Sequence, residues 1–392
     1  MADVPADLLR ALYGASEAVI PPSKCTIWRV VTGVDCAALD AAIGAWPARR
    51  AGAGTGEDEP AATALFALIV DGKTVRGAVA ADGTQVHLLA AATHEHALVL
   101  AQTDVSAKTN EIPMFAPLLD TLDITGAVIT ADALHTQRRH ADYLHRRNAH
   151  YVFCVKDNQP GLFDALDALD WKQVPVTHTS TCRGHGRVET RALQVMPAPP
   201  DLPFPHVQQV FLVEREVTDL ARNALSNVAI FGITSLGSDR AGPTTLAALT
   251  RGHWGIESLH WIRDTLYRED DSRAHTRSGP RAMASLRNLA IGALRLAGRS
   301  DTAEATRWAA RRMEPSQPSQ HSSQRGTHLR HDHQLTVGAS GMADRPAGHD
   351  RRARSDRRLL ARRFLPDGRR AERHPGQCRA RQRPTRPQDR CR

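Results

Sequence analysis

Residues 65–73 read LFALIVDGK, a continuous apolar run that leads into the acidic Asp71. A short unbroken apolar run of this kind is typical of a strand that is buried on both faces of a sheet. Residues 127–135 read AVITADALH and repeat the arrangement, with Asp132 after the apolar run. If the two strands are parallel neighbours, both aspartates lie at the edge where open α/β sheets bind their ligands. The alternative for each is an ordinary turn or helix cap, because Asp-Gly favours hairpins and Asp favours N-caps.

The segments on either side alternate between strand and helix signals. We expect further strands at residues 86–93, 97–103 and 151–155, and helices at residues 111–122, 137–147 and 161–169. Clusters of β-branched residues without helical spacing predict a β-rich insertion, and helical spacing returns from residue 244 to about 312. Three leading strands followed by alternating helices and strands predict an α/β fold, with a mixed sheet flanked by helices.

Changes in composition divide the chain into four parts. These are a small helical N-terminal segment (1–47), a linker rich in Gly, Ala and charge (48–60), the main domain (61–312) with its β-rich insertion at about 177–236, and a tail (313–392). Within the first part, Ser23 is the expected cap of a helix over residues 26–31.

The net charge of +9 is unevenly distributed along the chain. Residues 314–392 hold 19 Arg and 8 acidic residues, a net of +11, which leaves a net of −2 for the rest. Any affinity of the folded part for nucleic acid must therefore come from local patches of charge. The tail also has no Lys and no sustained apolar period. It is either a disordered basic arm or a segment translated out of frame, and we assign it no fold.

Several classes of protein are excluded by what the sequence lacks. There is no run of about 18 apolar residues, so we expect no membrane span, and the first residues do not resemble a secretory signal. The six cysteines are scattered without a CxxC pair, which argues against a zinc module or a disulfide framework. We expect a protein of the reducing cytoplasm.

Two further groups of polar residues accompany the expected strand ends. Lys156 and Asn158 follow the run YVFCV, and Lys108, Asn110 and Glu111 form a second cluster. Each group alone is an ordinary loop. Together they place cationic and amide groups near the carboxylates, which suits a phosphate ligand.

A third acidic candidate lies in residues 251–270, RGHWGIESLHWIRDTLYRED. The competing side chains are Glu257, His253, Asp264, Glu269 and Asp270. A helix rich in Trp, His and carboxylates is more often a partly buried amphipathic helix than a catalytic one. A metal site is a second alternative, because His260 and Asp264 have the i, i+4 spacing of a zinc-binding pair.

Six segments together resemble a known family. They are DGKTVRGA (71–78), KTNEIPMFAPLLDTLDITGAVITADALHTQ (108–137), YVFCVKDNQ (151–159), GHGRVETR (184–191), HWGIESLHW (253–261) and EDDSR (269–273). In this order and spacing they resemble insertion-sequence transposases of the H-repeat-associated type. These belong to a superfamily with an Asp-Asp-Glu triad on a ribonuclease-H-like fold. The resemblance covers roughly residues 21–312, and the tail matches nothing in it.

The resemblance implies that Asp71, Asp132 and Glu257 are both the catalytic residues and the metal ligands. Glu257 matches the glutamate on the helix that follows the β insertion. The sequence departs from the family pattern at Ser258, where one residue is missing after the glutamate. Glu269 is the competing choice for the third carboxylate.

The resemblance also implies the cofactor and the chemistry. Three carboxylates suit Mg²⁺, or Mn²⁺ as its substitute, and two such ions roughly 4 Å apart support in-line displacement at phosphorus. We expect cleavage that frees a 3′-OH at the end of the element, followed by transfer of that strand to target DNA. Positioning contacts to phosphate are expected from Lys73, Arg76, Lys108, Gln137 and Lys156.

The implied partners are double-stranded DNA, namely the terminal inverted repeats of the transposon and the target, and a second copy of the chain on DNA. The expected location is the bacterial nucleoid in the cytoplasm. Two alternatives stay open. One is a nuclease of the same fold that cuts without joining, and the other is an inactive remnant that only binds DNA.

Overall fold

The apolar run that begins at Leu65 forms the start of strand β1 (Ala67–Val79) in the computed structural model of the chain. The structure describes residues 22–52, 65–79, 83–105, 110–184, 186–299 and 301–311. The expected helical signal before Pro21, Lys108 and the tail from Met313 lie outside these residues. Leu68, Ile69 and Val70 are completely buried, as the unbroken apolar run predicts.

The described strands form one mixed sheet in the order β3-β2-β1-β4-β5-β9-β8-β7-β6. After β1 the strands are β2 (Gln85–Thr93), β3 (Val99–Val105), β4 (Val128–Ala131), β5 (His150–Val155), β6 (Val176–Gly184), β7 (Arg187–Pro197), β8 (Gln209–Asp219) and β9 (Ala224–Thr234). Strands β1, β4 and β5 are parallel, and the other pairs are antiparallel. An antiparallel β1–β2–β3 meander joined to two parallel strands is the ribonuclease-H-like arrangement, so the predicted fold class is confirmed.

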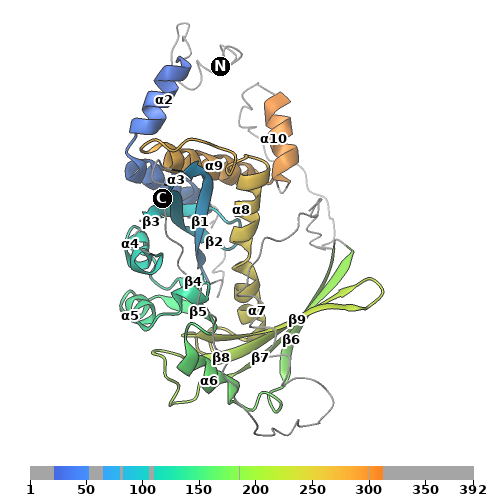
Figure 1. Ribbon diagram of the computed structural model, residues 1–392. Helices are drawn as coiled ribbons and strands as arrows, with labels where there is room; N and C mark the ends of the chain where they lie inside the picture. The colour runs from blue at the N-terminus through green and yellow to red at the C-terminus, as the bar shows by residue number, and fades with distance from the viewer. Residues whose placement is uncertain are drawn as a thin grey trace, which may run out of the picture. The chain divides into compact units, whose positions relative to one another are not determined.

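Helices cover both faces of the sheet (Figure 1). They are α2 (Lys24–Gly33), α3 (Cys36–Gly52), α4 (Phe115–Leu119), α5 (Arg138–Arg146), α6 (Pro160–Asp167), α7 (Pro243–Gly252), α8 (Gly255–Thr265), α9 (Gly279–Leu296) and α10 (Thr302–Arg311), with short 3₁₀ turns η1 (Ile112–Met114) and η2 (Ala133–His135). Ser23 caps α2 as expected, because its side chain accepts a hydrogen bond from the Thr26 N–H. No helix in the described ranges is long and apolar enough to cross a membrane.

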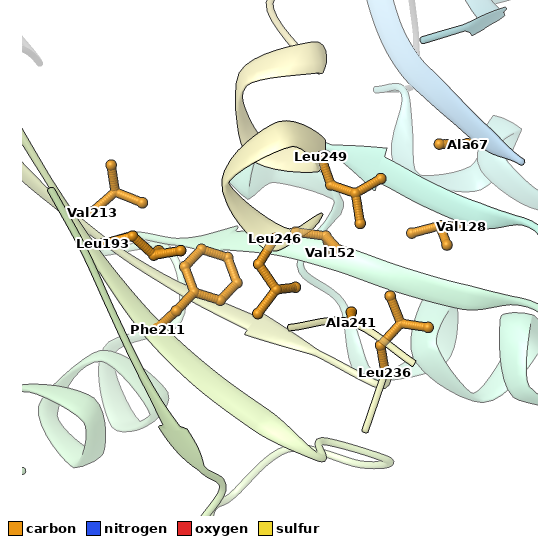
Figure 2. Packing of buried hydrophobic residues seen from close by; sticks show 10 residues of the cluster. All are labelled: Ala67, Val128, Val152, Leu193, Phe211, Val213, Leu236, Ala241, Leu246 and Leu249. Carbon is orange, nitrogen blue, oxygen red and sulfur yellow. The ribbon is translucent and has the colours of Figure 1, made fainter. Parts of the chain in front are cut away.

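One hydrophobic cluster joins the two halves of the sheet (Figure 2). Val128 and Val152 come from the parallel strands, and Phe211 comes from β8. Leu246 and Leu249 of α7 pack between them and are 0% and 6% exposed. Burial of each such side chain contributes about 1.5–3 kcal/mol to folding. Helix α7 therefore fixes the insertion strands to the central strands.

A second cluster fixes α8 on one face of β1. Ile69 of β1 packs with Ile256, Leu259 and Ile262, which follow the i, i+3, i+6 spacing of one helix face. Ile291 of α9 completes the contact. The strand that carries Asp71 and the helix that carries Glu257 are therefore packed directly together.

Three local expectations differ from the structure. Asp71 and Gly72 form no turn, because β1 continues and pairs with β2 through Asp71↔Ala90 and Gly72↔Leu89. Helix α3 continues to Gly52, so the first residues of the expected linker are helical. Glu269 does not share a helix with Glu257, since α8 ends at Thr265.

Candidate active site

Asp71 and Asp132 lie next to each other at one level of the sheet. The parallel pairing of β1 and β4 ends with Val70↔Ala131; Asp71 is the next residue of β1, and Asp132 is the first residue after β4. At this level β4 stops, and the Asp132 side chain caps η2 by accepting a hydrogen bond from the Leu134 N–H at 2.9 Å. The structure thus brings together the two aspartates that the sequence placed after separate apolar runs.

Helix α8 runs alongside β1 in a matched register. The Nδ1 atom of His260 lies 3.6 Å from Oδ2 of Asp71. Two residues further along the strand, the Lys73 ammonium group donates to Oδ2 of Asp264 at 2.8 Å. Two residues of a strand and four residues of a helix both span about 6–7 Å along their axes. The Asp71–His260 and Lys73–Asp264 contacts therefore follow each other at the same spacing on β1 and α8. Glu257 lies one helical turn before His260, in the first turn of α8.

The three expected carboxylates interact electrostatically. The pKa of Asp71 is raised to about 7, mainly by burial; the negative charges of Glu111, Asp132 and Glu257 also raise it, and a hydrogen bond from the Gly72 N–H lowers it. Partial burial also raises the pKa of Glu257, whose side chain is on the exposed side of α8. The cluster therefore holds more negative charge than its surroundings neutralise.

Such a cluster suits a hard divalent cation in charge and in donor chemistry. Across the described ranges, however, no three His, Cys, Asp or Glu side chains are arranged as a ready-made metal site. The carboxylates fit the ion chemically, and the structure gives no coordination geometry for it.

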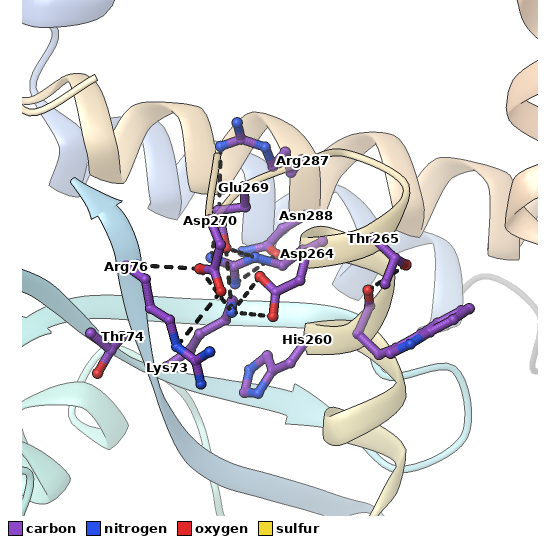
Figure 3. A network of polar contacts seen from close by, with 12 residues as sticks. Lys73, Thr74, Arg76, His260, Asp264, Thr265, Glu269, Asp270, Arg287 and Asn288 are labelled. Atoms are coloured by element: carbon purple, nitrogen blue, oxygen red, sulfur yellow. Dashed lines mark hydrogen bonds and ion pairs between the residues drawn. The ribbon is translucent and has the colours of Figure 1, made fainter. Parts of the chain in front are cut away.

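Glu269 is committed to a separate, buried ion network (Figure 3). It is 0% exposed and accepts two hydrogen bonds from Arg263 of α8, both at 2.9 Å, and one from Arg287 of α9 at 3.3 Å. These partners differ from Arg268 and Arg273, the neighbouring arginines in the sequence. Glu269 thus links α8 to α9.

Lys73 belongs to the same network. Its side chain is 8% exposed, and its ammonium group lies 2.6 Å from one oxygen of Asp264 and 3.9 Å from both Glu269 and Asp270. An ammonium group with these three acidic neighbours already has its charge matched. In this arrangement Lys73 connects β1 to α8 beside the carboxylates.

The other expected phosphate contacts lie in different settings. Arg76 is 78% exposed and lies 3.7 Å from Asp270. Lys156 is exposed immediately after β5. Gln137 precedes α5, and its side-chain amide donates to the Leu134 carbonyl at 3.0 Å.

The sequence offered His253 and His260 only as candidates for an acidic or zinc site, and it did not indicate that they lie partly buried near the carboxylates together with His94. His94 and His253 lie 2.8 and 3.2 Å from the Thr130 hydroxyl, and burial lowers the pKa of both to about 4. Burial likewise lowers the pKa of His260 to about 3. All three imidazoles are therefore neutral at pH 7. No spacing in the sequence indicates this, because the three residues come from separate parts of the chain.

The possible zinc pair, His260 and Asp264, does not converge on one site. His260 lies near Asp71, and Asp264 binds Lys73.

Among its charged neighbours, Glu111 raises the pKa of Asp71 the most, a role that its place in the polar cluster with Lys108 and Asn110 did not reveal. Its two oxygens accept hydrogen bonds from His87 at 2.7 Å and from His135 at 3.1 Å. Burial raises the pKa of Glu111, but these bonds lower it more, to about 2. A side chain at Gly72 would collide with this carboxylate, so the close approach requires glycine.

The class of this protein follows from its fold and its candidate site. The sheet is ribonuclease-H-like, and Asp71 and Asp132 lie together where the pairing of β1 and β4 ends. Glu257 lies on α8, which packs against β1. A family model for the transposase DDE domain matches residues 67–292, which is more than half of the chain. The chain belongs to the transposase DDE-domain family, as its sequence motifs indicated.

Two relatives in sequence agree with this assignment. The chain is 28% identical over 298 residues to "Putative transposase YncI" of Escherichia coli O157:H7, covering 72% of this chain and 73% of that protein. It is 25% identical over 244 residues to "H repeat-associated putative transposase YhhI" of Escherichia coli strain K12, covering 58% of this chain and 63% of that protein. A solved structure of the piggyBac transposase synaptic complex with hairpin DNA matches 61% of this chain and 48% of its own, at 11% identity and a TM-score of 0.34.

Proposed function

We propose that this transposase cleaves DNA at the ends of an insertion sequence and joins the freed 3′-OH to target DNA. The observation that carries the proposal is the placement of Asp71 beside Asp132 at the end of paired parallel strands, with Glu257 close enough to raise the pKa of Asp71. Three clustered acids without matching cations are costly to a fold, and such clusters are typical of functional sites.

In this proposal the three carboxylates share one task, which is to bind the metal ions. Asp71, Asp132 and Glu257 supply the oxygen ligands for Mg²⁺ or Mn²⁺. Two such ions, when bound, would activate water or a 3′-OH and stabilise the leaving oxygen. Asp71 is held on a central strand and Glu257 on a helix packed against it, so the protein fixes their relative positions before substrate arrives. The neutral His260 beside Asp71 adds no positive charge that would compete with a cation.

Exposed cations position the DNA backbone. Arg76, further along β1, and Lys156, after β5, contact phosphates, with Gln137 and Lys108 as further contacts. Lys73 acts on the substrate only indirectly, because Asp264 already holds its ammonium group. The partners are the terminal inverted repeats and target DNA, bound by two copies of the chain at the nucleoid. Residues 61–312 form the catalytic domain, with residues 177–236 as its insertion.

Cleavage and joining by matched variants test the proposal. With Mg²⁺ or Mn²⁺, the full chain should cut a duplex carrying the terminal repeats and should join a pre-cut end with a free 3′-OH. Asp71→Asn and Asp132→Asn should each lose both activities by more than a hundredfold while keeping the fold. Asp201→Asn, an exposed residue outside the site, is the control and should retain both.

The other possible outcomes of these assays support other functions or another site. Cleavage without joining of the pre-cut end would show a nuclease. DNA binding without either activity would show an inactive remnant. Wild-type cleavage by Asp71→Asn would remove that residue from the site.

A further inference from the structure

Beside the candidate site, strand β1 presents different side chains to its two faces. Asp71 and Lys73 both contact side chains of α8. Successive residues of a strand point to opposite faces, so Gly72 and Thr74 face away from α8. Figure 3 shows Lys73 directed toward Asp264 and Thr74 turned away from it. The face of β1 opposite α8 therefore carries no side chain at Gly72, directly beside Asp71.

Glu111 fills the space that Gly72 leaves. A side chain on Gly72 would collide with one carboxylate oxygen of Glu111 and with Nε2 of His87. The Glu111 side chain is 17% exposed and belongs to the residue just before η1. Its carboxylate therefore packs against the backbone of β1, one residue from Asp71, on the face opposite α8. This approach depends on glycine, because every other residue places a Cβ there.

Two histidines hold the Glu111 carboxylate in this position. Nε2 of His87 lies 2.7 Å from one oxygen, and Nε2 of His135 lies 3.1 Å from the other. An ionised carboxylate only accepts hydrogen bonds, so both imidazoles donate, which each can do while neutral. Although burial raises the pKa of Glu111, these bonds bring it to about 2, so the group is ionised at neutral pH. Among the described residues no Lys or Arg pairs with Glu111 to cancel its charge.

The charge of Glu111 acts on Asp71. Burial is the largest cause of the raised pKa of Asp71, and among the charged groups Glu111 contributes more than Asp132 or Glu257. Neighbouring buried carboxylates repel each other, and the repulsion is unfavourable unless a cation lies beside them. A divalent cation bound by Asp71 would be attracted by the same charge.

We propose that Glu111 is a positioning residue for the metal ions: from the face of β1 opposite α8, its charge strengthens the binding of a divalent cation by Asp71, Asp132 and Glu257. The proposal rests on the proposed function, because those three carboxylates must hold the cation. Glu111 is not itself a ligand, since two histidines engage its oxygens and the backbone of β1 separates it from α8. Groups outside the ligand shell of a metal ion commonly tune its affinity in this way.

Binding of Mn²⁺ to the full chain without DNA tests this. Electron paramagnetic resonance of free Mn²⁺ at about pH 8, where Asp71 is mostly ionised, gives the affinity and the number of bound ions. Glu111→Gln keeps the shape of the side chain and removes its charge. It should weaken the affinity about ten- to hundredfold and leave the number of ions unchanged. Glu111→Asp keeps the charge and should recover most of the affinity. Glu216→Gln, an exposed residue of β8, removes the same charge elsewhere and should bind Mn²⁺ as the wild type does.

A second variant separates the effect of charge from an effect on the fold. Gly72→Ala displaces the Glu111 carboxylate without removing its charge, so it should also weaken Mn²⁺ binding. In the Glu111→Gln background the same substitution should cause no further loss, because no charge is left to displace. A distortion of β1 would instead weaken binding equally in both backgrounds. Gly72→Ala also tests the proposal if Glu111→Gln does not fold.

Wild-type affinity in Glu111→Gln would overturn the proposal, as would an equal loss in Glu216→Gln. A smaller number of bound ions in Glu111→Gln would also overturn it, since Glu111 would then be a ligand. Equal losses from Gly72→Ala in both backgrounds would contradict an effect of charge. Asp71→Asn, measured in parallel, tests the proposed function itself, because it should lose Mn²⁺ binding whatever the Glu111 variants do. Loss in Asp71→Asn with none in Glu111→Gln would overturn the role of Glu111 alone.

Discussion

At the scale of single residues, Asp71 is destabilising in its ionised form when no cation is bound. Its folded pKa of about 7 lies above the ordinary value of 3.8, so the folded chain binds more protons than the unfolded chain between these pH values. Stability must therefore fall as the pH rises from about 4 to 7 and stay level above that. A cation at the site would reverse this cost.

The expected result is that Asp71→Asn stabilises the metal-free protein. The gain should be near zero below pH 4, grow through pH 5–7, and reach on the order of 2 kcal/mol, since the side chain keeps 25% exposure and solvent reduces the full effect. Chemical unfolding in EDTA across this pH range measures it. Asp201→Asn should show no such trend. A gain that does not vary with pH would contradict the raised pKa of Asp71.

At the scale of elements, we expect Glu257 to act in catalysis and Glu269 to stabilise the fold. Glu269 is fully buried with Arg263, so Glu269→Gln should cost about 3–5 kcal/mol by leaving a buried guanidinium group without its partner. Glu257 lies on the exposed side of α8, so Glu257→Gln should change stability by less than about 0.5 kcal/mol while abolishing cleavage. Urea unfolding and Mn²⁺-dependent cleavage, measured on both variants, give the comparison. Mn²⁺-dependent cleavage by Glu257→Gln at the wild-type rate would show that another residue is the third carboxylate.

The predictable elements are those whose burial leaves a pattern in the sequence. Strand β4 is buried at every position and matched its apolar run. Strand β6 was not predicted individually, because it is an edge strand with largely exposed side chains and no apolar alternation. The continuation of β1 beyond Asp71 was also missed, since its pairing with β2 depends on tertiary contacts.

At the scale of the whole molecule, topology assembles the candidate site. Asp71 and Glu257 are 186 positions apart in the chain, and no local pattern relates them. After the insertion strands, α7 packs into the cluster that joins the two halves of the sheet, and α8 then returns along β1. The prediction that these three carboxylates form the site comes from the family resemblance and stays a prediction. The contacts of His87 and His135 with Glu111, and of His260 with Asp71, could not be predicted, because these side chains meet only when β2, η2 and α8 are packed together.

The composition of residues 314–392 leads to a last prediction at this scale. This segment carries a net charge of +11 and no sustained apolar period. This composition predicts too little buried apolar surface to offset the entropy of ordering the segment, so we expect a protein ending at Met313 to fold with an unchanged unfolding midpoint. The truncated chain should nevertheless bind non-specific duplex DNA more weakly, with a shallower dependence on salt, because cations that release counterions are lost.

Titration of a duplex without terminal repeats at several salt concentrations measures this effect. The two chains should converge in affinity at high salt, where counterion release no longer favours the longer one. Equal salt slopes for both would show that the basic segment does not contact DNA. A truncated chain that fails to fold would show that residues beyond Met313 stabilise the domain, against what their composition predicts. Joining activity retained by the truncated chain would place all the residues needed for catalysis before residue 314.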